Sequence, residues 1–157
     1  MKELIILAGL PGSGKSTYAK NHFNKPNTFI IDSDETRKKM FGSYLIFPKD
    51  MYVIYDEMIK EGNELYDKYN DLILIMDSTF LDNYRRNHYL DNLKKFDKYV
   101  IIMFHSQDIN FNLKNNKQRI KDKWVPESVI LKMVDQYEPL DEKTRARFNE
   151  VIDIYVP

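Results

Sequence analysis

Residues 9–17, Gly-Leu-Pro-Gly-Ser-Gly-Lys-Ser-Thr, have the composition and spacing of a phosphate-binding loop. They fit the pattern G-x-x-x-x-G-K-[ST], with an apolar run at 4–8 before them and a helix-compatible stretch after them. Glycines let the backbone curl so that successive N–H groups point at phosphate oxygens, and the following helix adds its positive end. The residues expected to bind the nucleotide are Gly12, Ser13, Gly14, Lys15, Ser16 and Thr17.

Two side chains of this loop are expected to act on the nucleotide directly. Lys15 should reach the β- and γ-phosphates of ATP, and the Ser16 hydroxyl should complete the coordination of Mg²⁺. The alternative is a flexible Gly-Ser-Gly connection with no ligand. It is disfavoured because the strand, turn and helix signals agree at one place.

Two further apolar runs end in carboxylates. Residues 28–31 lead into Asp32-Ser33-Asp34, and residues 72–76 lead into Asp77. Because the carboxyl ends of parallel strands share one sheet edge with the phosphate-binding loop, Asp34 and Asp77 should flank the γ-phosphate. One suits the positioning of a metal or an acceptor, and the other suits taking a proton from an attacking hydroxyl. Either aspartate could instead cap the helix that follows it.

The elements that must position these residues are short apolar runs that alternate with segments of helical period. Two of the runs, 72–76 and 100–104, are continuously apolar, as in strands buried on both faces of a sheet. Strands alternating with helices indicate parallel βαβ units. Strands are expected at 4–8, 28–31, 72–76, 99–104 and 151–155, and helices near 15–23, 34–41, 49–69, 82–95, 107–117 and 126–137.

We therefore predict one α/β domain over residues 1–157, a three-layer P-loop NTPase fold with a mostly parallel five-stranded sheet. A basic run that includes Lys117, Arg119 and Lys123 suggests a mobile helical lid at about 112–126 that folds over ATP. A solvated helix face is the alternative. Arg119 is the favoured lid residue, and its neighbouring lysines are expected at the surface.

Composition excludes several other kinds of chemistry. The 157 residues contain no cysteine, which rules out disulfides, thiolate zinc sites and cysteine catalysis. No apolar run reaches the roughly 18 residues of a membrane helix, so a cytoplasmic protein without a membrane partner is expected. Lys plus Arg equal Asp plus Glu at 24 each, so any contact with nucleic acid must be local. The sequence does not indicate an oligomeric state.

Taken in order, these motifs resemble the small P-loop kinases typified by the bacteriophage polynucleotide 5′-kinase. The resemblance extends over nearly the whole chain. Its first motif is highly specific, and the others gain weight from their order. It is carried by residues 9–17, 32–37 (Asp-Ser-Asp-Glu-Thr-Arg), 76–79 (Met-Asp-Ser-Thr) with 85–86 (Arg-Arg), 116–119 (Asn-Lys-Gln-Arg), 125–126 (Val-Pro) and 137–139 (Tyr-Glu-Pro).

The resemblance implies roles for individual residues. Asp34 would be the general base on the acceptor hydroxyl, and Arg37, on the same helix face, would hold the acceptor's phosphate. Asp77 would orient the acceptor, with Thr79 also in the substrate-binding set. Arg119 would reach over the donor phosphates and offset charge during transfer. The implied catalytic residues are Lys15, Asp34 and Arg119.

Three departures from the phage enzyme concern the acceptor. Thr79 stands where that enzyme has an asparagine, Asn115 stands where it has a further lid arginine, and one extra residue follows Arg119. A kinase without the phage enzyme's phosphatase domain is expected. The leading hypothesis is transfer of the γ-phosphate of ATP to a 5′-hydroxyl of DNA or RNA. The alternatives are a small acceptor (nucleoside, nucleotide or metabolite) and a switch that hydrolyses ATP slowly.

Other polar side chains keep two interpretations. Arg85 and Arg86 either meet a nucleic-acid phosphate or make local pairs. Trp124 either stacks on a base or packs against the protein, with packing favoured. Arg145 and Arg147 are expected at the surface, and the three scattered histidines lack the spacing of metal ligands.

Overall fold

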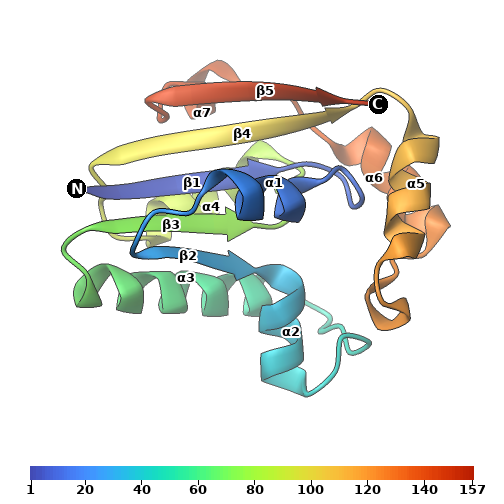
Figure 1. Cartoon of the computed structure of the whole chain (residues 1–157), viewed down its shortest axis with the longest axis horizontal. Coiled ribbons are helices and arrows are strands. Elements are labelled where there is room, and N and C mark those ends of the chain that lie inside the picture. Colours follow the sequence, from blue (N-terminus) through green and yellow to red (C-terminus); the bar gives the residue numbers. More distant parts are fainter.

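A computed structural model describes residues 1–157 and contains one five-stranded sheet with the strand order β2-β3-β1-β4-β5 (Figure 1). All four pairs of neighbouring strands are parallel, which confirms the predicted α/β fold. Each strand includes its apolar run and extends slightly beyond it. The strands are β1 (Lys2–Ala8), β2 (Thr28–Asp32), β3 (Leu72–Asp77), β4 (Lys98–Ser106) and β5 (Glu150–Val156).

The six predicted helices are present, and two short ones join them. The prediction for 49–69 begins too early, because the Asp50 carboxylate accepts the N–H of Tyr52 (3.0 Å) in a local turn. The prediction for 82–95 ends too late, because the backbone is extended at Leu93. The helices are α1 (Lys15–His22), α2 (Ser33–Phe41), α3 (Tyr52–Lys68), α4 (Asn83–Asn92), α5 (Ile109–Gln118), the 3₁₀ turn η1 (Lys121–Lys123), α6 (Glu127–Gln136) and α7 (Glu142–Arg145). The sequence did not predict η1 or α7.

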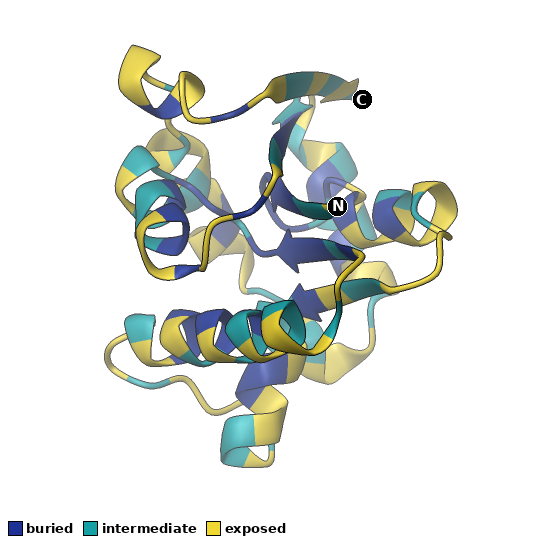
Figure 2. Cartoon of the chain, turned by 90° about the vertical axis from the view of Figure 1, so that its left-hand side faces the viewer, coloured by how far each residue is buried: buried dark blue, intermediate teal, exposed yellow.

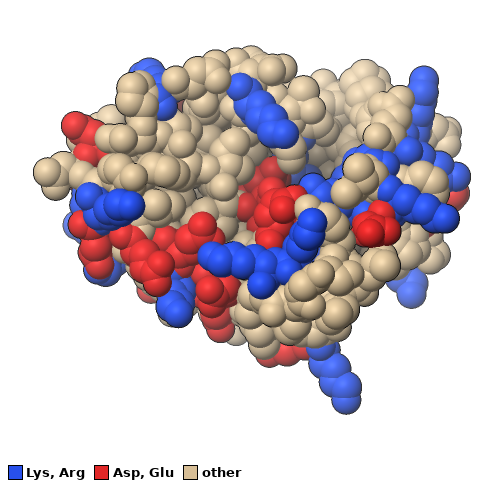
Figure 3. Space-filling view, turned by 60° about the horizontal axis from the view of Figure 1, so that its bottom comes forward, with Lys and Arg blue, Asp and Glu red and all other residues tan.

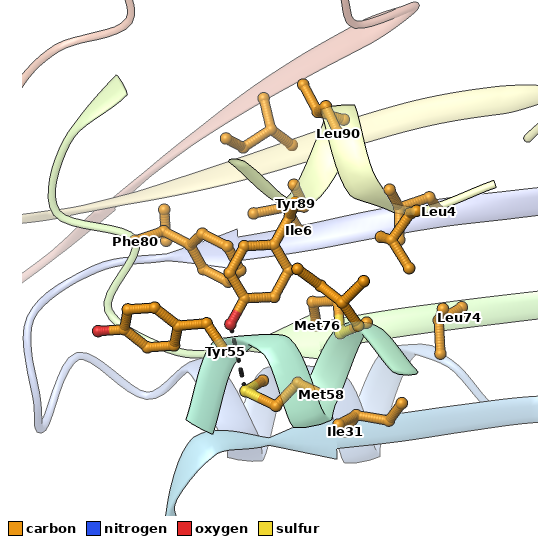
Figure 4. Close-up of a cluster of buried hydrophobic side chains, with 14 of the residues drawn as sticks. Leu4, Ile6, Ile31, Tyr55, Met58, Leu74, Met76, Phe80, Tyr89 and Leu90 are labelled. Atoms are coloured by element: carbon orange, nitrogen blue, oxygen red, sulfur yellow. Dashed lines mark hydrogen bonds between the residues drawn. The ribbon is translucent and has the colours of Figure 1, made fainter. Parts of the chain in front are cut away.

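Helices cover both faces of the sheet, which is why its central strands are continuously apolar. Along β1, Leu4 and Ile6 belong to the cluster that α3 and α4 cover, whereas Ile5 and Leu7 belong to the cluster on the α1 face. Figure 2 shows the central strands buried and the outer sides of the helices exposed. The larger cluster lies beneath α3 and α4, where the Tyr89 hydroxyl donates to the Met58 sulfur (3.2 Å; Figure 4). None of the helices combines the length and the apolar character needed to span a membrane.

The carboxyl ends of the strands meet at one edge of the sheet, toward α2 and α5 (Figure 1). The register of β2 against β3 places Asp32 opposite Asp77. The N–H of Gly9, just after β1, donates to the carbonyl of Thr79, just after β3 (3.0 Å). This edge therefore gathers the three segments that the sequence singled out for chemistry.

Candidate active site

The phosphate-binding loop joins β1 to α1 and depends on glycines in the left-handed region. Gly12 has φ 77°, and Gly14, the N-cap of α1, has φ 86°. Residues with a side chain rarely adopt these angles. A Cβ on Gly12 would also lie 2.3 Å from the carbonyl oxygen of Asn112, so the loop packs directly against α5. The loop shape that the sequence predicted is thus determined by packing against α5 as well as by the glycines of the loop.

Two asparagines of α5 anchor the loop. Asn112 is buried and donates to the carbonyl of Pro11 (3.0 Å), and Asn115 donates to the carbonyl of Gly12 (3.0 Å). At the sequence level, Asn115 was only a departure from a lid arginine. The sequence held one signal that could have indicated this role for the two asparagines: Asn112 and Asn115 are three residues apart, which places both amides on one helix face. The start of the predicted lid therefore also supports the donor site.

Lys15 is buried within this loop. Its ammonium donates to the carbonyls of Gly9 (2.8 Å) and Leu10 (3.1 Å). Burial lowers the pKa of Lys15, and the charges of Asp77 and Asp34 act in the opposite direction. Lys15 follows β1 and Asp34 follows β2, so both residues lie at the carboxyl edge of the parallel sheet.

The loop also presents hydroxyl groups suited to phosphate and metal binding. Ser13 is buried, and its hydroxyl has no hydrogen-bond partner within the protein. The Ser16 hydroxyl donates to the carboxylate of Asp77 (2.6 Å) at the end of β3. A hydroxyl beside a carboxylate suits Mg²⁺, which prefers oxygen ligands and usually shares them with substrate phosphates. The protein contains no group of three or more His, Asp or Glu residues placed to hold a metal ion by itself.

Asp34 lies in the first turn of α2, between two arginines. It forms ion pairs with Arg37 (3.2 Å) and with Arg119 of the lid. It does not cap the helix, because the cap is Asp32, whose carboxylate accepts the N–H of Glu35 (2.7 Å). The capping alternative considered for Asp34 is therefore wrong, and both of its oxygens face guanidinium groups.

Asp32 is a member of the carboxylate group that sequence reasoning did not select. Burial raises the pKa of Asp32 to about 6, and the charges of Asp77 and Asp34 act in the same direction. The hydrogen bond from the N–H of Glu35 opposes this shift. The signal in the sequence was its place as the last residue of the strand, but only the strand register shows that it lies opposite Asp77.

Arg37 is buried and fixed on three sides. Its Nε donates to the carbonyl of Tyr44 (3.0 Å), its Nη1 pairs with Asp34, and its guanidinium lies 4.1 Å from the centre of the Phe47 ring. The position of the guanidinium is therefore set by α2 and by the loop that follows it.

The predicted lid region consists of most of α5, then η1 and the chain up to Pro126. Asn116 exchanges two hydrogen bonds with the backbone of Val125, and the Trp124 indole donates to the carbonyl of Arg119 (2.8 Å). Lys123 forms an ion pair with Glu35 of α2 (2.8 Å). Figure 3 shows acidic side chains gathered near the middle of one face, with Lys and Arg side chains beside them. The lid thus contacts α2 through two separate ion pairs.

The remaining candidates divide between local structure and the surface. Arg86 is fully buried and donates to the carbonyls of Phe80 (2.8 Å) and Glu138 (2.8 Å), so its proposed contact with a nucleic-acid phosphate is wrong. Arg85 lies 3.7 Å from Asp82. Thr17 is exposed on α1. Arg145 is exposed as expected, and Arg147 pairs with Asp91 (2.7 Å).

A parallel sheet with a glycine-rich phosphate-binding loop at its carboxyl edge is the arrangement of a P-loop protein. The sequence model of the family described as "AAA domain" matches residues 4–140. The chain belongs to this family, a family of P-loop kinases.

Similar proteins agree with this class. The L-seryl-tRNA(Sec) kinase of Methanococcus maripaludis is 27% identical over 143 residues, which cover 86% of this chain and 52% of that protein. The structure is similar to a chain of the Pnkp1/Rnl/Hen1 RNA repair complex (TM-score 0.69, 23% identity, 94% of this chain and 46% of that one). It is also similar to a gluconokinase from Sinorhizobium meliloti 1021 (TM-score 0.62, 16% identity, 98% and 82%). The chain spans about half the length of the first two.

Proposed function

We propose that this P-loop kinase transfers the γ-phosphate of ATP to a 5′-hydroxyl of DNA or RNA. The observation that carries the proposal is the position of Asp34, held between Arg37 and Arg119 at the sheet edge that also holds Lys15. A carboxylate so placed can accept a proton from an alcohol that attacks the terminal phosphate. The resemblance to polynucleotide 5′-kinases and the relatives that act in RNA repair or on a tRNA support this choice of acceptor.

The donor half of the proposed reaction rests on the phosphate-binding loop. Backbone N–H groups of the loop would hold the phosphates, and Lys15 would turn its ammonium from the carbonyls of Gly9 and Leu10 to the β- and γ-phosphate oxygens. Ser16, whose hydroxyl lies beside the Asp77 carboxylate, would hold Mg²⁺, which supplies positive charge to phosphate oxygens when bound. The Ser13 hydroxyl is a further donor for the phosphates.

The acceptor half rests on side chains of α2 and the lid. Asp34 would orient the 5′-hydroxyl and take its proton, while Arg37 holds the phosphate next to that hydroxyl. Arg119 would neutralise charge that develops on the transferred group, as a lid arginine does in phosphoryl transfer. Asp77 and Thr79 lie at the end of β3 and complete the proposed substrate-binding set.

The test is transfer of label from γ-labelled ATP to DNA and RNA oligonucleotides that carry a 5′-hydroxyl. Asp34→Asn should lower the transfer rate by about 10²- to 10⁴-fold while ATP binding remains. An oligonucleotide with a 5′-phosphate is the matched control acceptor and should receive no label. Absence of label from every 5′-hydroxyl oligonucleotide would remove the proposal, and an unchanged rate in the Asn variant would favour a nucleotide-dependent switch.

A small acceptor is the second candidate, and one contact favours it. Asn115, which stands where the phage enzyme has a lid arginine, is engaged with the carbonyl of Gly12 and leaves the lid with fewer positive charges for a polynucleotide. The net charge of zero points the same way. The same assay with nucleosides, nucleotides and sugars as acceptors decides the matter. Label on these acceptors with none on oligonucleotides would reverse the order of the two candidates.

A further inference from the structure

The loop between α2 and α3 exposes three large apolar side chains in succession. Leu45, Ile46 and Phe47 are 64%, 47% and 61% exposed, whereas Tyr44 before them is buried. Apolar side chains scattered singly over a surface are ordinary, but a contiguous exposed group often marks a binding site. Three residues separate this group from the end of α2, the helix that carries Asp34 and Arg37.

Tyr44 anchors the loop, so its position relative to α2 is well determined. The Tyr44 hydroxyl donates to Glu35 (2.6 Å), and its carbonyl accepts the Nε of Arg37. The ammonium groups of Lys38 and Lys123 lie 4.7 and 4.9 Å from the centre of its ring. The three apolar side chains therefore extend from a fixed support that also touches the lid.

Phe47 differs from its two neighbours because its ring contacts the acceptor site. The guanidinium of Arg37 lies over the ring at 4.1 Å, and the same guanidinium pairs with Asp34 at 3.2 Å. A single side chain thus separates the carboxylate proposed as the base from an aromatic ring that is more than half exposed. One face of that ring is covered by Arg37, which leaves the exposed remainder for another planar group.

We propose that Phe47 is a stacking platform for the base of the acceptor's 5′-terminal nucleotide. This inference rests on the proposed function and names the part of the substrate that Phe47 recognises. A nucleotide end presents a hydroxyl, a phosphate and a planar base, and the structure offers in order a carboxylate, a guanidinium and an aromatic ring. Stacking on an aromatic ring accepts any base, because every base has a π-face.

The experiment compares two oligonucleotide acceptors that differ only in the presence or absence of the base on the 5′-terminal nucleotide. KM and kcat are measured for wild type, Phe47→Ala, Phe47→Trp and Leu45→Ala. With the base present, Phe47→Ala should raise KM roughly tenfold and leave kcat within about twofold, since stacking acts on binding. The abasic acceptor should show the raised KM already in wild type, with no further increase in Phe47→Ala. Phe47→Trp should restore the low KM.

Leu45→Ala is the matched control, because Leu45 lies in the same loop at nearly the same exposure but has no ring to stack. It should leave both constants unchanged. The inference is overturned if Phe47→Ala leaves KM unchanged, or if it impairs both acceptors equally, as expected of a residue that only supports Arg37. In either case 5′-hydroxyl oligonucleotides are still labelled and the proposed function stands. If wild type labels no oligonucleotide, the proposed function and this inference both fall.

Discussion

The two halves of the candidate site are built in different ways. The donor half is made mainly of backbone: a loop with two left-handed glycines, wedged against α5 and anchored by Asn112 and Asn115. The acceptor half is made of side chains from α2, the following loop and the lid, joined by ion pairs around Asp34 and Glu35. In the proposed reaction, the donor half holds one chemical group, a polyphosphate, in a fixed manner, and the acceptor half selects the substrate.

The largest expected effects come from one substitution in each half of the site. Lys15→Met should lower transfer to every acceptor by about 10²- to 10³-fold, because it removes the charge proposed to act on the phosphates of the donor. Arg37→Lys keeps a positive charge but loses the planar guanidinium, which can donate two hydrogen bonds to one phosphate. It should lower kcat/KM for oligonucleotides by about 10- to 100-fold without weakening ATP binding. Calorimetric titration with ATP beside the transfer assay checks both. Weakened ATP binding in Arg37→Lys would show that the two halves are not independent.

A pair of glycine variants compares the rigidity of the two halves. Gly12→Ala should cost about 3 kcal/mol or more of unfolding free energy, because the new Cβ meets the Asn112 backbone as well as a positive φ. Gly42→Ala, at the end of α2, has the same φ of 77° but open space around the Cβ, and should cost about 1 kcal/mol. Urea denaturation of both variants measures the difference. Equal losses of unfolding free energy in the two variants would mean that the loop can move away from α5 to make room for the new Cβ.

The two adjacent arginines of α4, outside the donor and acceptor halves, test which of them supports the fold. Arg86→Met should destabilise the fold by about 3 kcal/mol, because two carbonyls, those of Phe80 and Glu138, lose a buried donor. Arg85→Met removes a partly exposed arginine paired with Asp82 and should cost less than about 1 kcal/mol. Thermal unfolding of the two variants provides the comparison. A larger loss in the Arg85 variant would contradict the assignment of Arg86 as the structural member of the pair.

The smallest expected effect concerns Asp32, at the boundary of the two halves. Its folded-state pKa, about 6, lies above its ordinary value of 3.8, so the fold disfavours its charged form. The stability of wild type should therefore decline as the pH rises from about 4 through about 6, by about 1–2 kcal/mol from this group. Asp32→Asn keeps the helix cap and lacks this titration. The unfolding free energy of Asp32→Asn minus that of wild type should increase between pH 4 and 6 and then stay constant. A difference that does not change with pH would contradict the raised pKa of Asp32.

Much of the scaffold was predictable from the chain because it depends on local or periodic patterns. The continuous apolar run at β3 predicted a strand buried on both faces, and the loop motif predicted the start of α1. The helix ends were less accurate, because single turns such as the one at Asp50 decide them. The arginines illustrate the limit within the site. The sequence left Arg85 and Arg86 equivalent, whereas one turns inward to backbone carbonyls and the other stays near the surface.

The sequence by itself determined the phosphate-binding loop and the sheet that carries it, because a run of glycines between a strand and a helix is a local property. Only the tertiary structure decided how the side chains of the acceptor half meet, because the sequence named Asp34, Arg37 and Arg119 without showing all their contacts. The pairing of Asp34 with Arg119 joins residues 85 positions apart, and the contact of Phe47 with Arg37 depends on the path of an irregular loop. Such contacts follow from the packing of whole elements against one another, and no periodicity in the chain records them.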